Sequence, residues 1–181
     1  MFVAILAISI SPGPALANQK GWVVQYGTPV RDAAGGVAVD GHDVYIAGGT
    51  DGAFPGETNA GAGDVYIRKY NSRGELQWVD QFGTPGIDNV GAGNLSARRN
   101  RAAVAGTVRG ALPGQTWAGL TDGYVRAYDR HGNVLWTYQF GSPEDDNVRS
   151  VAIARDGSVV AVGHTTGQLG SEPKAGQTDA S

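Results

Sequence analysis

An eight-residue stretch occurs three times in the chain and limits the fold more than any other feature. The copies read Trp-Val-Val-Gln-Tyr-Gly-Thr-Pro, Trp-Val-Asp-Gln-Phe-Gly-Thr-Pro and Trp-Thr-Tyr-Gln-Phe-Gly-Ser-Pro. They begin at Trp22, Trp78 and Trp136, which are 56 and 58 residues apart. Self-similarity at a fixed period of this order indicates a solenoid, a propeller or another array. We therefore interpret the chain as a repeat protein.

Each repeat has the pattern of four short antiparallel strands. In the first copy, β-branched runs at 36–40 and 43–48 flank a Gly-His pair and predict a hairpin. A third strand is expected at 65–70, with apolar or aromatic residues on both faces, and a fourth at 76–82. No helical period of apolar residues is visible after residue 20.

The other two copies follow the same pattern with local differences. In the second copy the third and fourth strands are expected at 123–128 and 134–140, but the first strand is poorly marked. Three arginines between residues 98 and 101 indicate an exposed hairpin tip there. The third copy has a hairpin pattern at 150–154 and 158–163, and it stops near Asp179, where its third strand would begin.

Composition supports a folded, turn-rich protein and excludes several classes of function. Hydrophobic residues make up 41% of the chain, together with 29 glycines and 8 prolines. The 14 basic and 17 acidic residues leave a net charge of −3 without a basic run, which argues against nucleic acid or an anionic membrane as partner. Because cysteine is absent, neither disulfides nor thiolate metal sites can form.

The first 17 residues are interpreted as a secretory signal peptide. An apolar run from residue 1 to residue 10 precedes Ser-Pro-Gly-Pro and a small-x-small site that ends at Ala17. The run is too short to span a bilayer. The alternative is a buried first strand. The signal predicts that residues 18–181 are exported, to the periplasm, the cell surface or the outside, with no membrane span in the mature chain.

The repeat resembles a known family. The succession Trp-x-x-Gln-aromatic-Gly-Thr-Pro, Val-Ala-Val-Asp, Val-Tyr-Ile-Ala-Gly and Gly-Asp-Val-Tyr-Ile-Arg-Lys-Tyr-Asn-x-x-Gly-x-Leu-x-Trp is similar to the SBBP β-propeller repeat of exported bacterial proteins. The resemblance covers residues 22–181. It implies a propeller fold and export, and members of the family mostly have no assigned enzymatic activity.

The number of repeats predicts an incomplete propeller of about two and a half blades. Residues 36–82 and 92–140 would form full blades, whereas 22–26 would be an outer strand without a blade of its own. Propellers close with about four to eight blades. We therefore expect a truncated chain or a fragment of a longer protein. The alternative is that a chain of this length associates with copies of itself into a ring.

Four residues are candidates for binding. Asp32, Asp88 and Asp146 follow the three Gly-Thr/Ser-Pro turns and could gather a cation or sugar hydroxyls, although fixing the turn backbone is the favoured role. Trp117 is an unrepeated aromatic residue in a Gly-rich loop. No spacing of residues predicts a catalytic group, a metal site or a cofactor.

The favoured function is a non-enzymatic, exported scaffold or binding module. Its partner would be a protein or a carbohydrate, held by the loops between the repeated strands. Two alternatives stay open. The turn-to-Trp segments at 71–78 and 129–136 are similar to those of quinone-dependent dehydrogenase propellers, and the chain could also be a truncated reading frame without a function of its own.

Overall fold

The computed structural model of the chain describes residues 5–8, 21–171 and 179–180, and these residues form an all-β structure of antiparallel sheets. The described residues contain no helix, and therefore none that could cross a membrane as a long apolar helix.

Two complete sheets have four strands each, paired in chain order. The first contains β3 (Asp32–Asp40), β4 (Asp43–Thr50), β5 (Asp64–Tyr70) and β6 (Leu76–Phe82). The second contains β7 (Asn89–Arg98), β8 (Arg101–Val108), β9 (Asp122–Asp129) and β10 (Val134–Phe140). Short turns join the first strand to the second and the third to the fourth, and a longer Gly-rich loop joins the second to the third, which makes each sheet a meander. Four antiparallel strands per repeat are therefore confirmed for these two repeats.

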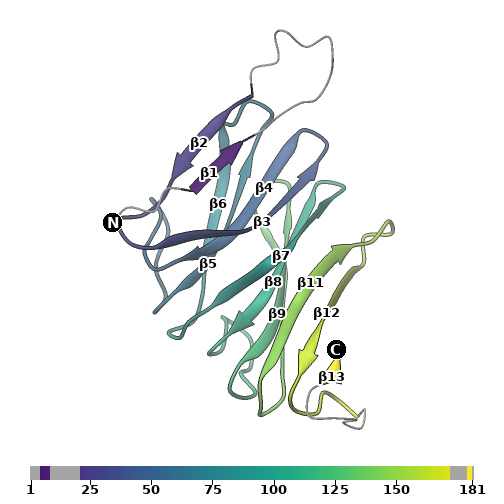
Figure 1. The fold of residues 1–181 in the computed structure, drawn as a ribbon. Helices are drawn as coiled ribbons and strands as arrows, with labels where there is room; N and C mark the ends of the chain where they lie inside the picture. Colours follow the sequence, from purple (N-terminus) through teal and green to yellow (C-terminus); the bar gives the residue numbers. More distant parts are fainter. Residues whose placement is uncertain (1–4, 9–20, 172–178, 181) are drawn as a thin grey trace.

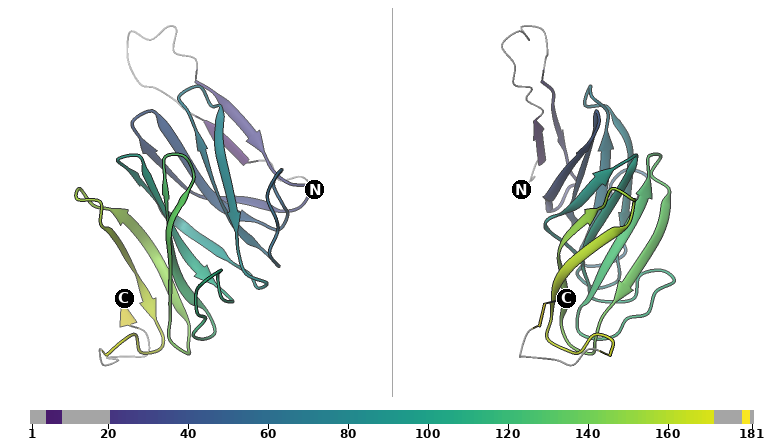
Figure 2. Two further views of the ribbon diagram at one scale, coloured as in Figure 1. Left: turned by 180° about the vertical axis from the view of Figure 1, so that it is seen from behind. Right: turned by 90° about the vertical axis from the view of Figure 1, so that its right-hand side faces the viewer.

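Two smaller sheets lie at the ends of the molecule. The N-terminal sheet pairs β1 (Ile5–Ile8) with β2 (Val23–Tyr26), and the C-terminal sheet contains β11 (Asp146–Ile153), β12 (Val159–Thr165) and β13 (Asp179–Ala180). The four sheets follow one another in a row from the N-terminal hairpin to β13 (Figure 1). The described strands leave this row open and do not close it into a ring (Figure 2).

The first strands of consecutive sheets lie next to each other. Strand β3 contacts β7, and β7 contacts β11. Parallel bridges between Gly63 and Ile87 and between Thr121 and Asp145 link each sheet to the next near these strands. The later strands of each sheet lie progressively farther from this line of first strands (Figure 1).

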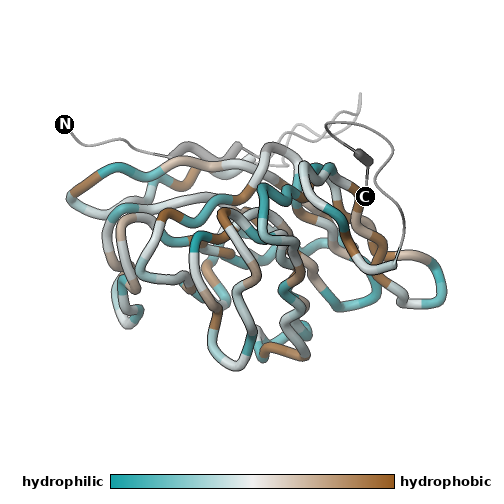
Figure 3. The backbone as a smooth tube through the Cα atoms, turned by 90° about the horizontal axis from the view of Figure 1, so that it is seen from below, coloured by the Kyte–Doolittle hydropathy of each residue, from teal (hydrophilic) through white to brown (hydrophobic). Residues whose placement is uncertain are grey.

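The hydrophobic core fills the spaces between facing sheets. Apolar and polar residues alternate along much of the chain (Figure 3), which is the period that strands require. Strand β5 is the exception, because each of its seven residues is buried. It is covered on both faces, as predicted from the sequence. The main core cluster contains Tyr45, Val65, Ile67, Val104, Tyr124 and Tyr128.

The expectation of a poor first strand in the second copy is wrong. Strand β7 runs for ten residues, although its sequence is rich in Gly, Asn and Ala. It lies between β3 and β11, and Leu95 is buried in the core. A register shift between Val90 and Leu95 absorbs the irregular segment as a bulge. The arginine-rich tip is confirmed, because Arg99 and Asn100 form the turn with φ angles of 54° and 61°.

The N-terminal hairpin has the register of a later part of the chain. Ile5 pairs with Tyr26 and Ile8 with Val23, just as Val65 pairs with Phe82 and Arg68 with Val79. Strand β1 therefore pairs with β2 in the register in which β5 pairs with β6. The alternative to a signal peptide, a first strand within residues 1–17, requires a pairing of this kind. Cleavage after Ala17 falls outside the described residues and stays a prediction.

Candidate functional site

The three turn aspartates bind the backbone of their own turns. Asp32, Asp88 and Asp146 are buried, and each accepts the backbone N–H of the residue four positions earlier. The N–Oδ2 distances are 2.6, 2.5 and 2.5 Å. This is the turn-fixing role expected from the sequence. A ligand-binding role for these residues stays untested.

A repeated glutamine, whose role the sequence did not reveal, fixes the Gly-rich loop of each full sheet. The Gln81 side chain accepts the N–H of Phe54 at 3.0 Å and donates to Asp64 at 2.9 Å. Gln139 does the same with Leu112 and Asp122, at 2.9 Å in both cases. The presence of glutamine at this position in all three copies is the sequence feature that could have revealed its role. The network holds the loop against the first residue of the third strand.

Steric crowding explains why the repeated motif has glycine at this position. A Cβ atom added at Gly83 would lie 2.4 Å from Asp64 Oδ1 and 2.6 Å from Asp88 Oδ2. The second full sheet repeats this arrangement at Gly141, which lies against Asp122 and Asp146. The pKa of Asp88 is raised to about 6, mainly by burial; hydrogen bonds from Thr84 and Arg109 oppose the rise, and the nearby Asp64 carboxylate adds to it.

The repeated tryptophans pack one sheet against the next. Trp78 stacks on Tyr128 of the following sheet, with ring centroids 5.6 Å apart, and donates to the carbonyl of Arg130 at 3.1 Å. It also lies against Gly132, whose φ of +89° and missing Cβ make room for the ring. Trp22 contacts Tyr70 and Gly74 in the same way.

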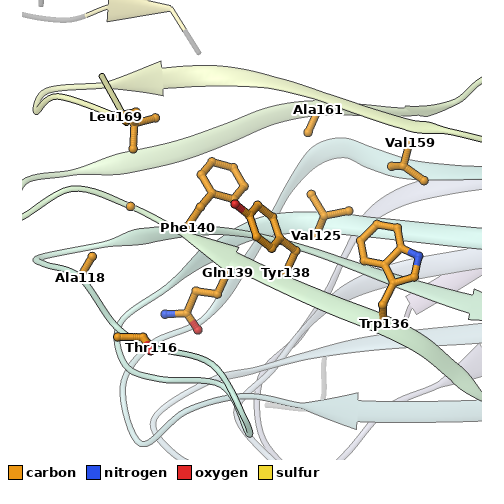
Figure 4. A pocket seen from close by; sticks show the side chains of 12 residues that line it. Thr116, Ala118, Val125, Trp136, Tyr138, Gln139, Phe140, Val159, Ala161 and Leu169 are labelled. Atoms are coloured by element: carbon orange, nitrogen blue, oxygen red, sulfur yellow. The ribbon is translucent and has the colours of Figure 1, made fainter. Parts of the chain in front are cut away.

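Trp136 is the exception, because no described residue plays the role of Tyr128 or Gly132 for it. Its side chain is 41% exposed, and the neighbouring Tyr138 is 62% exposed. Trp136, Tyr138 and Phe140 line one wall of a groove of about 650 Å³ between β10 and β12. Figure 4 shows these rings along β10, with Val159 and Ala161 of β12 opposite. Leu169 closes one end of the groove.

The groove occupies the place that a third strand fills in both complete sheets. Strand β12 pairs with β11 along one edge, but on its other edge only His164 and Thr165 pair, with β13. Thr165 faces Asp179 as Thr50 faces Asp64 and as Val108 faces Asp122. Strand β13 is therefore the start of a third strand in the standard register. Residues 159–163 present an edge that no described strand covers.

The loop that carries Trp117 borders this groove. Its neighbours Thr116 and Ala118 both line it, and the Trp117 side chain itself is 48% exposed. The loop that carries Trp117 thus reaches the groove mouth (Figure 4). The sequence indicated this residue but not the groove. The three turn aspartates are not among the residues that line it.

Metal-ligand geometry is not found in the described ranges, where no three His, Asp or Glu residues gather closely enough to hold an ion.

Comparison with known proteins gives one distant relative and leaves the family open. The chain is 29% identical over 152 residues to the regulatory protein FlaEY of Caulobacter vibrioides. The match covers 74% of this chain and 16% of that protein, so the chain spans about a sixth of its relative's length. No family model matches the chain. The resemblance to the SBBP repeat stays a prediction.

Proposed function

We propose that the chain forms consecutive blades of an exported β-propeller, of the kind that the SBBP resemblance implies, and works as a binding scaffold and not as an enzyme. The repeated meander sheets, with their first strands side by side, support the blade assignment. The distant relative is described as regulatory, which is compatible with a role in binding.

The outer faces of the end sheets also support the propeller. Val160 is 54% exposed on β12, whereas the equivalent residues Tyr45 and Ala103 are fully buried between sheets. Toward the N-terminal end of the row, Val37 and Val39 of β3, in the first complete sheet, are exposed. Both faces are therefore suited to packing against a further sheet of the same kind.

The groove between β10 and β12 is the single observation that carries the binding function. It combines an aromatic wall with an apolar floor, held on a frame of buried hydrogen bonds. An extended protein segment suits this lining, because its alternate side chains can lie along the row of rings.

Selection from a library of displayed random peptides tests this function. The full chain is the target, and Ala161→Trp, which fills the groove, is the counter-target. Val160→Trp is the matched control, because it makes the same kind of change on the opposite face of β12. Peptides that bind the wild type and Val160→Trp but not Ala161→Trp support the proposal. If no peptide distinguishes the two variants, the groove is not a binding site.

Export is proposed from the N-terminal segment alone. Sequencing the N-terminus of the protein secreted by its own cells tests it. A mature chain beginning at Asn18 supports export, and a cytoplasmic chain that retains residues 1–17 contradicts it.

A further inference from the structure

We propose that the tip of the β7–β8 hairpin is a second interaction surface, which binds a carboxylate-rich segment of a partner protein through Arg98, Arg99 and Arg101. We call these three residues, with Asn100 between them, the arginine tip. The inference goes beyond the binding function proposed for the groove between β10 and β12, and neither depends on the other.

The arginine tip lies between the tips of two other hairpins. The backbone N–H of Asn100 donates to Asp40 of the β3–β4 hairpin at 2.6 Å. On the other side, a Cβ atom added at Gly157, in the β11–β12 turn, would lie 3.5 Å from Arg101 Nη1. The three hairpin tips follow one another along one side of the row (Figure 1). The surface is therefore built from three successive repeats.

The backbone of the arginine tip is unfavourable for the residues that it contains. Arg99 and Asn100 have φ angles of 54° and 61°, and they are the only non-glycine residues with positive φ in the described part of the chain. At the place of Arg99 the first repeat has Gly41, with a φ of 62°. Two-residue turns of this kind favour Asn followed by Gly, because an arginine side chain crowds the left-handed backbone. Strained backbone that persists often serves a function, and here it holds an arginine at the end of the hairpin.

The three guanidinium groups of the tip have no partner among the described residues. No ion pair, hydrogen bond or aromatic ring contact joins any of them to another group there. Arg99 and Arg101 are exposed. Arg73 gives the contrast, because at the turn between β5 and β6 it pairs with Glu75 at 2.9 Å. The N–H donors of the arginine tip are therefore available to a partner.

The carboxylates around the tip are bound to their own turns instead. Asp129 is opposite Arg101 in the ladder, but it accepts the N–H groups of His131 and Asn133 at 2.8 and 2.9 Å. Asp156, in the β11–β12 turn, accepts the N–H and the hydroxyl of the serine two positions later, at 3.0 and 2.7 Å. Together with Asp40, they leave the three arginines without a bound counter-charge.

A carboxylate-rich protein segment suits this surface better than other anions. Planar guanidinium groups bind carboxylates through two parallel hydrogen bonds. Hydrogen bonds from Ser158 lower the pKa of Asp156, and the charge of Arg99 lowers it further, so the tip favours ionised carboxylates in its surroundings. The acids between the arginines, and the net charge of −3, would repel the continuous phosphates of a nucleic acid. The separate carboxylates of a protein segment can avoid these acids.

The probe is a synthetic peptide of alternating Glu and Gly, titrated into the full chain by calorimetry at low and at high salt. A Gln-Gly peptide of the same length is the uncharged control, and single-stranded oligothymidine of equal charge is the polyanion control. On the protein side, one variant combines Arg98→Gln, Arg99→Gln and Arg101→Gln. Arg73→Gln is the control for loss of an exposed arginine that already has a partner. Circular dichroism verifies that the variants fold.

We expect the Glu-Gly peptide to bind the wild type and Arg73→Gln alike, and the triple variant about tenfold more weakly, the effect of three exposed charge pairs of ordinary strength. High salt should weaken the binding, because exposed charges are screened. Failure of the Glu-Gly peptide to bind the wild type, or equal binding to the triple variant, would overturn the inference. Tighter binding of oligothymidine would also overturn it, because the tip would then belong to a nucleic-acid surface.

A variant with a relaxed turn separates binding from folding. Arg99→Asn combined with Asn100→Gly gives the tip the Asn-Gly pair that this turn favours. We expect the melting temperature to rise and the peptide to bind about two- to threefold more weakly, because one of the three guanidinium groups is lost. Unchanged peptide binding in this variant would mean that the strained arginine serves no binding, and the inference would fail.

Two further measurements distinguish the arginine tip from the other surfaces. Ala161→Trp, which fills the groove between β10 and β12, should leave binding of the Glu-Gly peptide unchanged, and loss of binding there would place the peptide in the groove and overturn the inference. Sedimentation velocity tests whether the acidic segment belongs to a second copy of the chain. A monomer agrees with a separate partner, whereas an oligomer that the triple variant dissociates would assign the tip to self-association and contradict the proposal.

Discussion

Replacing Trp78 by alanine should destabilise the protein far more than the same change at Trp136. The two residues occupy the same position of the repeat, but only Trp78 has its partners in the next sheet. Its ring stacks on Tyr128, contacts Tyr45 and hydrogen-bonds to the carbonyl of Arg130. Removing a large, well-packed aromatic side chain costs about 3–5 kcal/mol. Because Trp78 is only partly buried, we expect a loss of about 3 kcal/mol in the free energy of unfolding.

Trp136→Ala is the matched control. Its ring is 41% exposed and lies in the open groove, so its removal should cost about 1 kcal/mol or less. Urea denaturation followed by circular dichroism measures both values, and the slope of each transition verifies that the same surface is exposed on unfolding. Equal losses for the two variants would refute the reasoning, because they would mean that the contacts with the following sheet contribute nothing.

Three further changes test the buried network around the repeated motif. Gly83→Ala should lower the free energy of unfolding by about 3 kcal/mol, because its Cβ would press against the carboxylates of Asp64 and Asp88, and an unchanged melting temperature would contradict this close approach. Because the folded protein holds the Asp88 proton up to a pKa of about 6, against 3.8 for an unperturbed carboxyl, the free energy of unfolding should fall by about 3 kcal/mol between about pH 4 and pH 6. Asp88→Asn should remove that part of the pH dependence. Urea denaturation of the wild type and of Asp88→Asn at several pH values measures it, and an identical change of the free energy of unfolding with pH in the two proteins would contradict the inference. Gln81→Ala leaves the N–H of Phe54 and one oxygen of Asp64 with fewer partners, so it should lower the free energy of unfolding by about 2 kcal/mol. It should also increase proteolysis in the 52–63 loop, and an unaltered cleavage rate would argue against the network.

The strands could be predicted where local pattern and tertiary contacts agree. The range 76–82 was predicted to the residue as β6, because a β-branched and aromatic run there ends in Gly-Thr-Pro. Strand β7 could not be predicted in this way. Its Gly, Asn and Ala residues have low strand propensity, and its conformation depends on packing between β3 and β11.

The candidate site was only partly predictable for a different reason. The roles of Trp78 and the turn aspartates could be inferred from repetition, because a residue present in every repeat is expected to stabilise the structure of that repeat. The role of Gln81 was missed, although the residue is repeated, because a glutamine in a strand usually faces solvent and only its contact with Asp64 reveals that it is buried. The groove depends on a relation between two sheets. Trp136 looks identical to Trp78 in sequence, and only the arrangement in space shows that its ring is left uncovered.

Residue-resolved hydrogen exchange of the full chain tests the central claim most directly, namely that β12 offers an uncovered edge where the other sheets hold a third strand. The comparison is between residues 159–163 of β12 and the equivalent residues 102–106 of β8, which pair with β9. The account predicts rapid exchange for those amides of 159–163 that point away from β11 and slow exchange for their counterparts in β8. Equal protection of the two strands in the free, monomeric protein would contradict it, because the edge of β12 would then already be covered.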